Sequence, residues 1–262
     1  MKYLLKLKYV GTGFCGFQVQ PGKLTVQSAL QDALEKVFGV RYDIKGCSRT
    51  DSGVHANVYF ATFDLPDDAT VRIECKKLVL ALNSVINDGI AILDATTVPE
   101  TFHVRHNVAS KEYVYIIADG RIRDPFDKDR VYFYMHKITD QMLEAMNRAG
   151  RAISGKRDYY CFMASGSSVA DTVRTVNYVR AERHGGHVHI YASADGFLYN
   201  MVRIIAGTLL DAARGKINES DVLHMIEQRD RSLAGPTLPA CGLYLNDVVF
   251  DKDYFNCNEV SK

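Results

Sequence analysis

An eleven-residue stretch from Gly46 to Ala56, with the sequence G-C-S-R-T-D-S-G-V-H-A, holds the residues best suited to chemistry. Its carboxylate, Asp51, and its guanidinium, Arg49, stand two positions apart in a polar segment that also contains glycines. The residues on both sides alternate in polarity and predict flanking strands. A turn held between two strands is a rigid place from which to present a catalytic group. The D-S-G sequence is also ordinary turn chemistry, because aspartate bonds its own backbone and glycine accepts positive φ.

Arg203 is the second candidate, because it is a rare charge in an apolar helical segment. Between Gly196 and Ala213 the formal charges are Arg203 and Asp211. A helix that is apolar almost all round is buried. A buried guanidinium needs a carboxylate partner, since an unpaired buried charge costs several kcal/mol. Asp51 is one candidate for that partner, and Asp211 or another nearby acid is the local alternative.

Aromatic and basic residues gather near the middle of the chain. Tyr113 lies in the segment S-K-E-Y-V-Y-I-I, where alternating tyrosines are usually core residues with their hydroxyls at the edge. Basic residues beside an aromatic suit a groove that follows an RNA backbone, although a plain linker would need no such explanation. Arg121 is a phosphate candidate in the next loop, where an exposed arginine can equally be solvated. The groove candidates are Phe102, His103, Val104, Arg105 and His106.

Composition indicates a soluble globular protein. The chain has 262 residues, 47% hydrophobic and 24% charged, with a formal net charge of +1. No apolar run reaches membrane-spanning length, and no signal peptide opens the sequence. Six cysteines without a C-x-x-C pair indicate reduced thiols in a cytoplasmic protein. His184, His187 and His189 lack an accompanying cysteine or acid, so we expect a hairpin rim and no metal site.

The hydrophobic pattern predicts the order β-α-β-β-α-β twice. This order is the ferredoxin-like arrangement. The predicted fold is therefore α+β, with two ferredoxin-like halves whose mainly antiparallel sheets pack side by side. Residues 1–105 form the first half, residues 106–250 the second, and residues 251–262 a polar tail. The expected strands are 3–10, 42–47, 54–65, 90–98, 111–117, 172–181, 187–194 and 241–250, and the expected helices are 26–38, 75–82, 140–153, 197–214 and 218–229.

Several of these segments resemble one known family. The Asp51 segment resembles the G-R-T-D-A-G-V-H-A catalytic motif of the TruA-type tRNA pseudouridine synthases, with Ser48 and Ser52 in place of Gly and Ala. The segment F-L-Y-N-M-V-R-I-I-A-G, which contains Arg203, resembles the family's M-V-R-x-I-x-G helix. K-E-Y-V-Y resembles its R/K-x-Y-x-Y strand, and F-H-V-R is similar to its F-H-A-R segment. The family's G-W-Q-x-Q is G-F-Q-V-Q here, with Phe17 in place of Trp.

The resemblance implies an RNA-uridine isomerase that makes pseudouridine at positions 38–40 of the tRNA anticodon stem-loop. It implies no metal and no organic cofactor, and a homodimer that binds tRNA. It also implies that the two side-by-side sheets surround a central RNA-binding cleft. Asp51 would place its carboxylate near C1′ of a flipped uridine, paired with Arg203, and Tyr113 would stack on the target base. Arg49 would fill the space left by the flipped base or hold a phosphate. The segment from Phe102 to His106 would contact tRNA.

Three alternatives remain at this stage. A paralogous pseudouridine synthase would act on another RNA. A non-catalytic protein with tandem RRM-like domains would need an RNP1-like string, and the segment N-V-Y-F-A-T-F that starts at Asn57 lacks its leading residues. A ferredoxin-like regulatory module would have no use for a buried Arg203 opposite Asp51.

Overall fold

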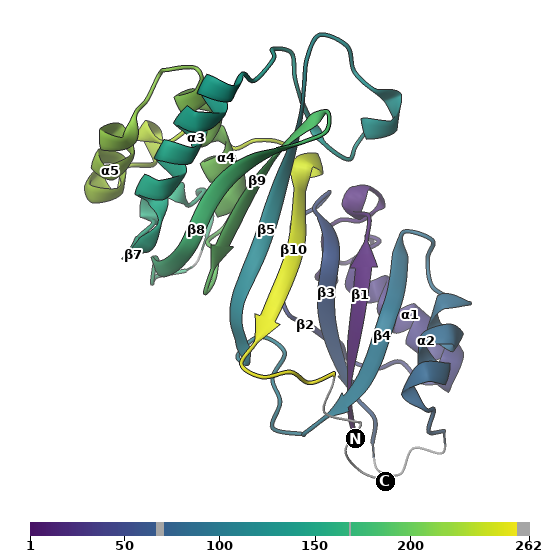
Figure 1. Cartoon of the computed structure of the whole chain (residues 1–262). Helices are drawn as coiled ribbons and strands as arrows, with labels where there is room; N and C mark the ends of the chain where they lie inside the picture. Colours follow the sequence, from purple (N-terminus) through teal and green to yellow (C-terminus); the bar gives the residue numbers. More distant parts are fainter. Residues whose placement is uncertain (67–70, 168, 256–262) are drawn as a thin grey trace. The chain divides into compact units, whose positions relative to one another are not determined.

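The computed structural model describes residues 1–66, 71–167 and 169–255, which form a mixed α+β fold, as predicted (Figure 1). The strand pairs are mostly antiparallel. Within the described residues, no helix is long and apolar enough to span a bilayer. The helices are α1 (Val26–Phe38), α2 (Cys75–Asn83), α3 (Asp140–Ile153), α4 (Met201–Ala213) and α5 (Glu219–Gln228). The strands are β1 (Lys2–Tyr9), β2 (Lys45–Gly46), β3 (His55–Asp64), β4 (Ile90–Val98), β5 (Val108–Asp119), β6 (Tyr132–Tyr134), β7 (Gly155–Asp158), β8 (Val173–His184), β9 (His187–Ala194) and β10 (Leu243–Phe250).

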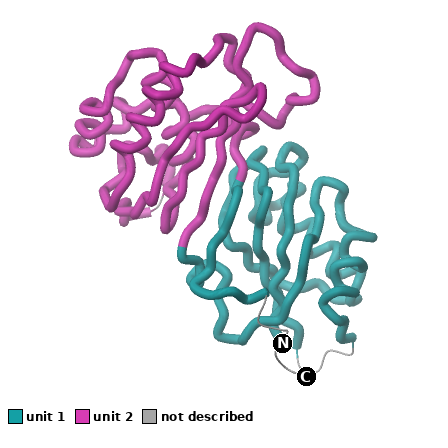
Figure 2. The backbone as a smooth tube through the Cα atoms, viewed as in Figure 1, with its two compact units in different colours: residues 1–109, 245–262 teal, residues 110–244 magenta. Residues whose placement is uncertain are grey.

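The chain divides into two compact units (Figure 2). Unit 1 contains residues 1–109 and 245–262, and unit 2 contains residues 110–244. The predicted boundary after residue 105 lies close to the first crossing between the units. Most of β10, which we expected in the second half, belongs to unit 1. The division into two ferredoxin-like halves stays a prediction.

Strand β1 is the centre of unit 1. It pairs antiparallel with β3 on one side and with β4 on the other. The short strand β2 pairs with the end of β3, where Gly46 faces Ala61. The predicted strand 42–47 is therefore shorter than expected, because Tyr42 packs its ring against Phe38 and Phe63 instead of entering the sheet. The buried apolar side chains of β1 are Tyr3, Leu4, Leu5, Leu7 and Tyr9.

Helix α1 begins and ends as its sequence predicts. The Thr25 side chain accepts a hydrogen bond from the Ser28 amide, and the Ser28 side chain caps the Thr25 amide in return. Gly39 follows the last turn with φ of 76°, a left-handed conformation that glycine adopts without steric cost. Local capping chemistry thus fixes both ends of this helix.

Helix α4 starts later than the sequence predicts. We expected it from Phe197, but the first helical residue is Met201. Asn200 has φ of 60°, a left-handed conformation that cannot continue a right-handed helix. The apolar residues before it, Phe197 and Leu198, form a turn that ends with the hydrogen bond from the Met201 amide to the Leu198 carbonyl. Arg203 therefore lies in the first turn of α4 and not in its middle.

In unit 2, strands β5, β9, β8 and β7 are neighbours in this order. Strands β8 and β9 form the predicted hairpin, in which His184 faces His187. On β9, the His189 ring lies 4.6 Å from the His184 ring, and its Nδ1 is 3.3 Å from the hydroxyl oxygen of Tyr191. Burial, helped by the two neighbouring histidines, lowers the pKa of His189 to about 4.

The low pKa of His189 predicts a loss of stability in acid. In the unfolded chain the ring has its ordinary pKa near ~6.5. Between this value and about 4, the unfolded state binds a proton that the folded state does not bind, so the free energy of unfolding falls as the pH falls. His189→Gln should make this dependence shallower in urea unfolding between the two pH values.

The matched control is His224→Gln, on the exposed side of α5. It should leave the slope of unfolding free energy against pH close to that of the parent. An equally steep slope in the His189 variant and in the parent would show that other groups cause the acid dependence.

Candidate active site

The segment around Asp51 is a tight turn between β2 and β3, as the sequence predicts. Asp51 is half-buried and Arg49 is exposed. The Val54 amide donates to the Asp51 carbonyl across 3.2 Å, and Gly53 has φ of 79°. Only a residue without Cβ adopts this φ at no steric cost. The backbone therefore closes into a tight turn immediately after Asp51.

Two tyrosine hydroxyls hold the residues on either side of Arg49. The Tyr59 hydroxyl donates to the Ser48 carbonyl, and the Ser48 amide lies 3.4 Å from the same hydroxyl oxygen. The Tyr9 hydroxyl shares a hydrogen bond of 2.7 Å with the hydroxyl of Thr50. Both tyrosines are buried in the sheet of unit 1. The turn is thus fixed by the sheet below it as well as by its own backbone.

The loop after β1 forms the other wall of the turn. The Phe17 amide donates to the Thr50 carbonyl across 3.1 Å. Gly16 has φ of 81°, and a Cβ at this position would lie 2.7 Å from the Thr50 carbonyl oxygen. The Gly11 amide donates to Nδ1 of the buried His55 across 3.0 Å. This histidine is therefore an acceptor that holds the loop after β1 against the start of β3.

Gly46 lies in close contact with two other segments, which carry Tyr59 and Phe17. A Cβ at this position would be 2.2 Å from the Tyr59 hydroxyl oxygen and 2.5 Å from the Phe17 ring. The Phe17 and Tyr59 rings stack with centroids 4.7 Å apart. Sequence reasoning missed the contribution of the loop after β1. Its signal was the set of glycines at positions 11, 13 and 16, of which two approach the Asp51 turn too closely for any side chain.

The segment from Phe102 to His106 meets the turn through one arginine. The Nε of Arg105 donates to the Gly46 carbonyl across 2.9 Å. The rings of His103 and His106 stack at 3.8 Å, and His103 Nδ1 accepts the Arg105 amide at 3.2 Å. Burial, followed by the interaction with the neighbouring His106, lowers the pKa of His103, which favours the neutral ring that this hydrogen bond requires. Arg105 and His106 are exposed.

Phe102 and Val104 do not line an exposed groove, contrary to the expectation for this segment. Their side chains are 4% and 1% exposed. The Phe102 ring packs against Tyr254 at 4.5 Å and Phe250 at 5.5 Å. Because alternate residues of the segment are turned inward, Phe102 and Val104 anchor it and leave the charged residues outside.

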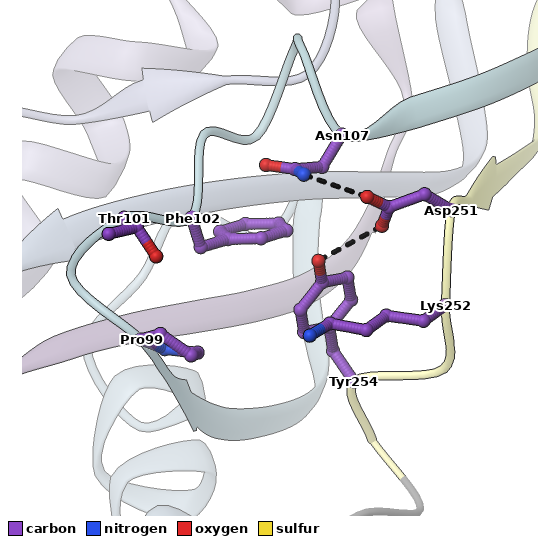
Figure 3. A pocket seen from close by; sticks show the side chains of 7 residues that line it. All are labelled: Pro99, Thr101, Phe102, Asn107, Asp251, Lys252 and Tyr254. Carbon is purple, nitrogen blue, oxygen red and sulfur yellow. Dashed lines mark hydrogen bonds between the residues drawn. The ribbon is translucent and has the colours of Figure 1, made fainter.

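A pocket of about 220 Å³ lies beside this anchor (Figure 3). The Asp251 carboxylate accepts hydrogen bonds from the Asn107 side chain at 2.8 Å and from the Tyr254 hydroxyl at 2.9 Å. The Asn107 hydrogen bond is the main cause of the lowered pKa of Asp251. Asn107 also accepts the His103 amide at 2.8 Å. The expected polar tail therefore begins with packed residues, and residues 256–262 lie outside the described part of the chain.

Arg203 is held by the backbone and side chains around the start of α4. Its Nε donates to the Leu238 carbonyl across 2.7 Å, and its Nη1 donates to the Asn200 side chain across 2.5 Å. The local alternative partner, Asp211, contacts Arg214 at 3.4 Å and Lys216 at 3.1 Å. The pairing of Arg203 with Asp51 stays a prediction.

The other predicted site residues of unit 2 lie in different surroundings. Tyr113 on β5 is 7% exposed, and its ring packs edge-on against Phe197 at 5.1 Å. Arg121 lies in the loop after β5 and is exposed. Within residues 1–66, 71–167 and 169–255, no three histidine, cysteine or acidic side chains gather as metal ligands. His187 instead contacts Asp127 at 2.7 Å.

Comparison with known proteins links most of the chain to one group of enzymes. A family model described as tRNA pseudouridine synthase matches residues 7–107 and 149–251. The tRNA pseudouridine synthase A of Clostridium acetobutylicum is 39% identical over 246 residues, which cover 94% of this chain and 98% of that protein. The tRNA pseudouridine synthase A of Bacillus licheniformis is 39% identical over 253 residues, which cover 96% and 100%.

The close approach at Gly16 predicts a large cost for one added methyl group. Gly16→Ala places a Cβ against the Thr50 carbonyl in a backbone conformation that disfavours L-residues. We expect it to lower the free energy of unfolding by about 1–3 kcal/mol. Gly13→Ala is the control, because an added Cβ there meets no atom within 4 Å. Equal stability of both variants in urea unfolding would contradict the account of this contact.

Proposed function

We infer that this chain, which belongs to the tRNA pseudouridine synthase family, converts uridine to pseudouridine in tRNA. The observation that carries this conclusion is the family match over residues 7–107 and 149–251, together with near full-length identity of 38–39% to curated synthases. The first matched segment contains the R-T-D-S-G-V-H-A turn. The substrate site we propose is the anticodon stem-loop, at positions 38–40.

The reaction moves the sugar bond from one base atom to another. The C1′–N1 bond of uridine breaks, the base turns, and a C1′–C5 bond forms, after which C5 loses its hydrogen and N1 carries one. Asp51 supplies the carboxylate at C1′ of the extruded nucleotide. Either addition of this carboxylate to C1′ or removal of a sugar proton, which gives a glycal-type intermediate, fits a single well-placed carboxylate.

The bracing of the Asp51 turn supports this role. A carboxylate that must reach one sugar carbon reacts faster when it is held in position. Misplacement by about 1 Å can lower the reaction rate by roughly 100-fold. The Ser48 and Thr50 contacts with Tyr59 and Tyr9 limit the movement of the turn. Asp51 itself is only half-buried, which leaves its side chain accessible to a nucleotide.

We assign Arg203 and Tyr113 to the same reaction centre. Arg203 pairs with the Asp51 carboxylate and keeps it ionised, and its hydrogen bonds to Leu238 and Asn200 fix the guanidinium plane. Tyr113, fixed edge-on against Phe197, stacks on the target base. In this proposal the two ferredoxin-like halves flank the cleft that holds the RNA.

RNA binding is the proposed role of the exposed basic residues. Arg49, beside Asp51, fills the space left by the extruded base or holds a phosphate. Arg105, with His103 and His106 next to it, contacts the phosphate backbone, and Arg121 adds a further phosphate contact. We propose a cytoplasmic homodimer in which each copy carries one such site.

Loss of the Asp51 carboxylate should abolish isomerisation. The assay is tritium release from a tRNA transcript labelled at C5 of uridine, because C5 loses its hydrogen in the reaction. Asp51→Ala should release no tritium above background while binding the transcript with nearly unchanged affinity. Asp43→Ala, which removes an exposed carboxylate shortly before β2, should remain active. An active Asp51→Ala protein would exclude the proposed mechanism, and an inactive parent on every tRNA would exclude the function.

The salt dependence of binding should identify Arg105 as a phosphate contact. Each neutralised phosphate steepens the slope of log affinity against log salt by about 0.9 on a duplex and about 0.7 on a single strand. Arg105→Ala should therefore weaken binding and flatten this slope by roughly one unit, without changing which uridine is modified. The control is Arg41→Ala, because Arg41 is already paired with Asp32 and Glu35. An unchanged slope for the Arg105 variant would remove this residue from the RNA contact.

A further inference from the structure

The loop between β5 and β6 exposes two large apolar side chains almost completely. Phe126 is 91% exposed and Ile122 is 89% exposed. These are the highest values for any large hydrophobic side chain in the part of the chain that the structure describes, and the next is Leu80 at 72%. Figure 1 draws this segment as the teal loop that extends beyond the end of β5. Large apolar side chains that are exposed to this extent in one loop are a feature of binding surfaces.

The loop carries these side chains on a well-anchored backbone. The Asp127 carboxylate contacts His187 Nε2 at 2.7 Å, which joins the loop to the β8–β9 hairpin. The Tyr244 hydroxyl donates to the Arg130 carbonyl at 2.6 Å. Phe126 itself lies in a 3₁₀ turn, Pro125–Asp127. The Phe126 amide donates to the Asp124 carboxylate across 2.8 Å and so caps this turn. The exposed phenyl ring therefore stands on a fixed turn.

The base of the loop is equally well held. Strand β6 pairs in parallel with the end of β5, and the Gly120 amide donates to the Tyr134 carbonyl at 3.1 Å. Asp119, whose side chain has no solvent exposure, accepts both Nη atoms of Arg183 at 2.9 and 3.1 Å. Because the loop is ordered before any partner binds, binding to it carries a smaller entropic cost.

The charges around the two apolar residues favour a polyanionic partner. The loop has three acidic residues: the Asp124 carboxylate accepts the Phe126 amide, the Asp127 carboxylate contacts His187, and Asp129 is exposed. The basic side chains of the loop outnumber these acids, and all four are exposed: Arg121, Arg123, Lys128 and Arg130. Exposed cations beside a ring that is free to stack are the combination that binds single-stranded or looped RNA.

We propose that Phe126, in the same loop as the exposed Ile122, is a stacking contact for an unpaired base of the substrate RNA, outside the reaction centre. This inference rests on the proposed function for the identity of the RNA. Residues 120–131 lie between the two segments that the family model matches, so that match assigns them no role. The stacked ring would position the RNA while the flanking cations hold its phosphates.

The chain offers a direct probe of this contact because it contains no tryptophan. Phe126→Trp, combined with Asp51→Ala to prevent turnover, places a single indole at the proposed contact. Titration with an unmodified tRNA transcript should quench its fluorescence with the same midpoint as binding measured by filter retention. Leu80→Trp, on the exposed side of α2, is the control and should show no such quenching.

Affinity measurements separate stacking from simple apolar burial. Alanine substitution of an aromatic that stacks on one base weakens binding by roughly 5- to 150-fold. The affinity of Phe126→Ala for the transcript should fall by a factor in this range, and Phe126→Tyr should retain parental affinity. Phe126→Leu keeps the apolar bulk, but it should bind more weakly than the parent because it has no ring to stack. Leu80→Ala should bind like the parent. The two substituted side chains, Phe126 and Leu80, are both exposed, so the variants are expected to fold.

The outcomes distinguish this proposal from its rivals. Absent quenching, or equal binding by parent and Phe126→Ala, would overturn the stacking contact. Indole fluorescence that changes with protein concentration before RNA is added would assign the loop to contact between two copies of the chain, which also overturns it. If the parent releases no tritium from any tRNA, the proposed function fails, and quenching by RNA then reports on binding alone. Quenching by an RNA that the active parent converts supports both.

Discussion

The hydrogen bond from the Tyr59 hydroxyl to the Ser48 carbonyl holds the backbone of the Asp51 turn to the sheet of unit 1. It requires the phenol to pass beside Gly46, where an added Cβ would lie 2.2 Å from the hydroxyl oxygen. A phenolic hydroxyl in a buried position needs a polar partner, and the turn supplies one. The same interaction therefore satisfies the buried tyrosine and fixes the turn, so neither can change independently.

Other segments of unit 1 also contact Gly46 or the tyrosine beside it. The Gly46 carbonyl accepts Arg105, which brings the exposed basic residues after β4 to the edge of the turn. The Asn107 side chain, which follows the segment from Phe102 to His106, donates a hydrogen bond to Asp251 and so helps to hold that segment in place. Phe17 completes the packing by stacking on Tyr59. Segments far apart in the sequence thus converge on the start of one loop, which explains how a protein with a net charge of only +1 can present a locally basic surface there.

The sequence predicted the features that depend on local chemistry. Thr25 and Gly39 bound α1 as expected, and the turn at Asp51 lies between strands as expected. Features set by tertiary contacts were not predicted. The left-handed backbone at Asn200 delays α4, and the burial of Phe102 follows from aromatic partners that come from the end of the chain. The packing of the loop after β1 against the turn was equally invisible, because close approach of backbones leaves no pattern beyond glycine itself.

The most direct test of this account is the turnover of Tyr59→Phe. This variant keeps the ring that stacks on Phe17 and removes only the hydroxyl that holds the Ser48 carbonyl. If positioning of Asp51 depends on this bond, kcat for tritium release should fall by about 10- to 100-fold while RNA affinity remains near parental. A variant that is less stable in urea but has the parental kcat would contradict the account, because the bond would then serve the fold and not the reaction.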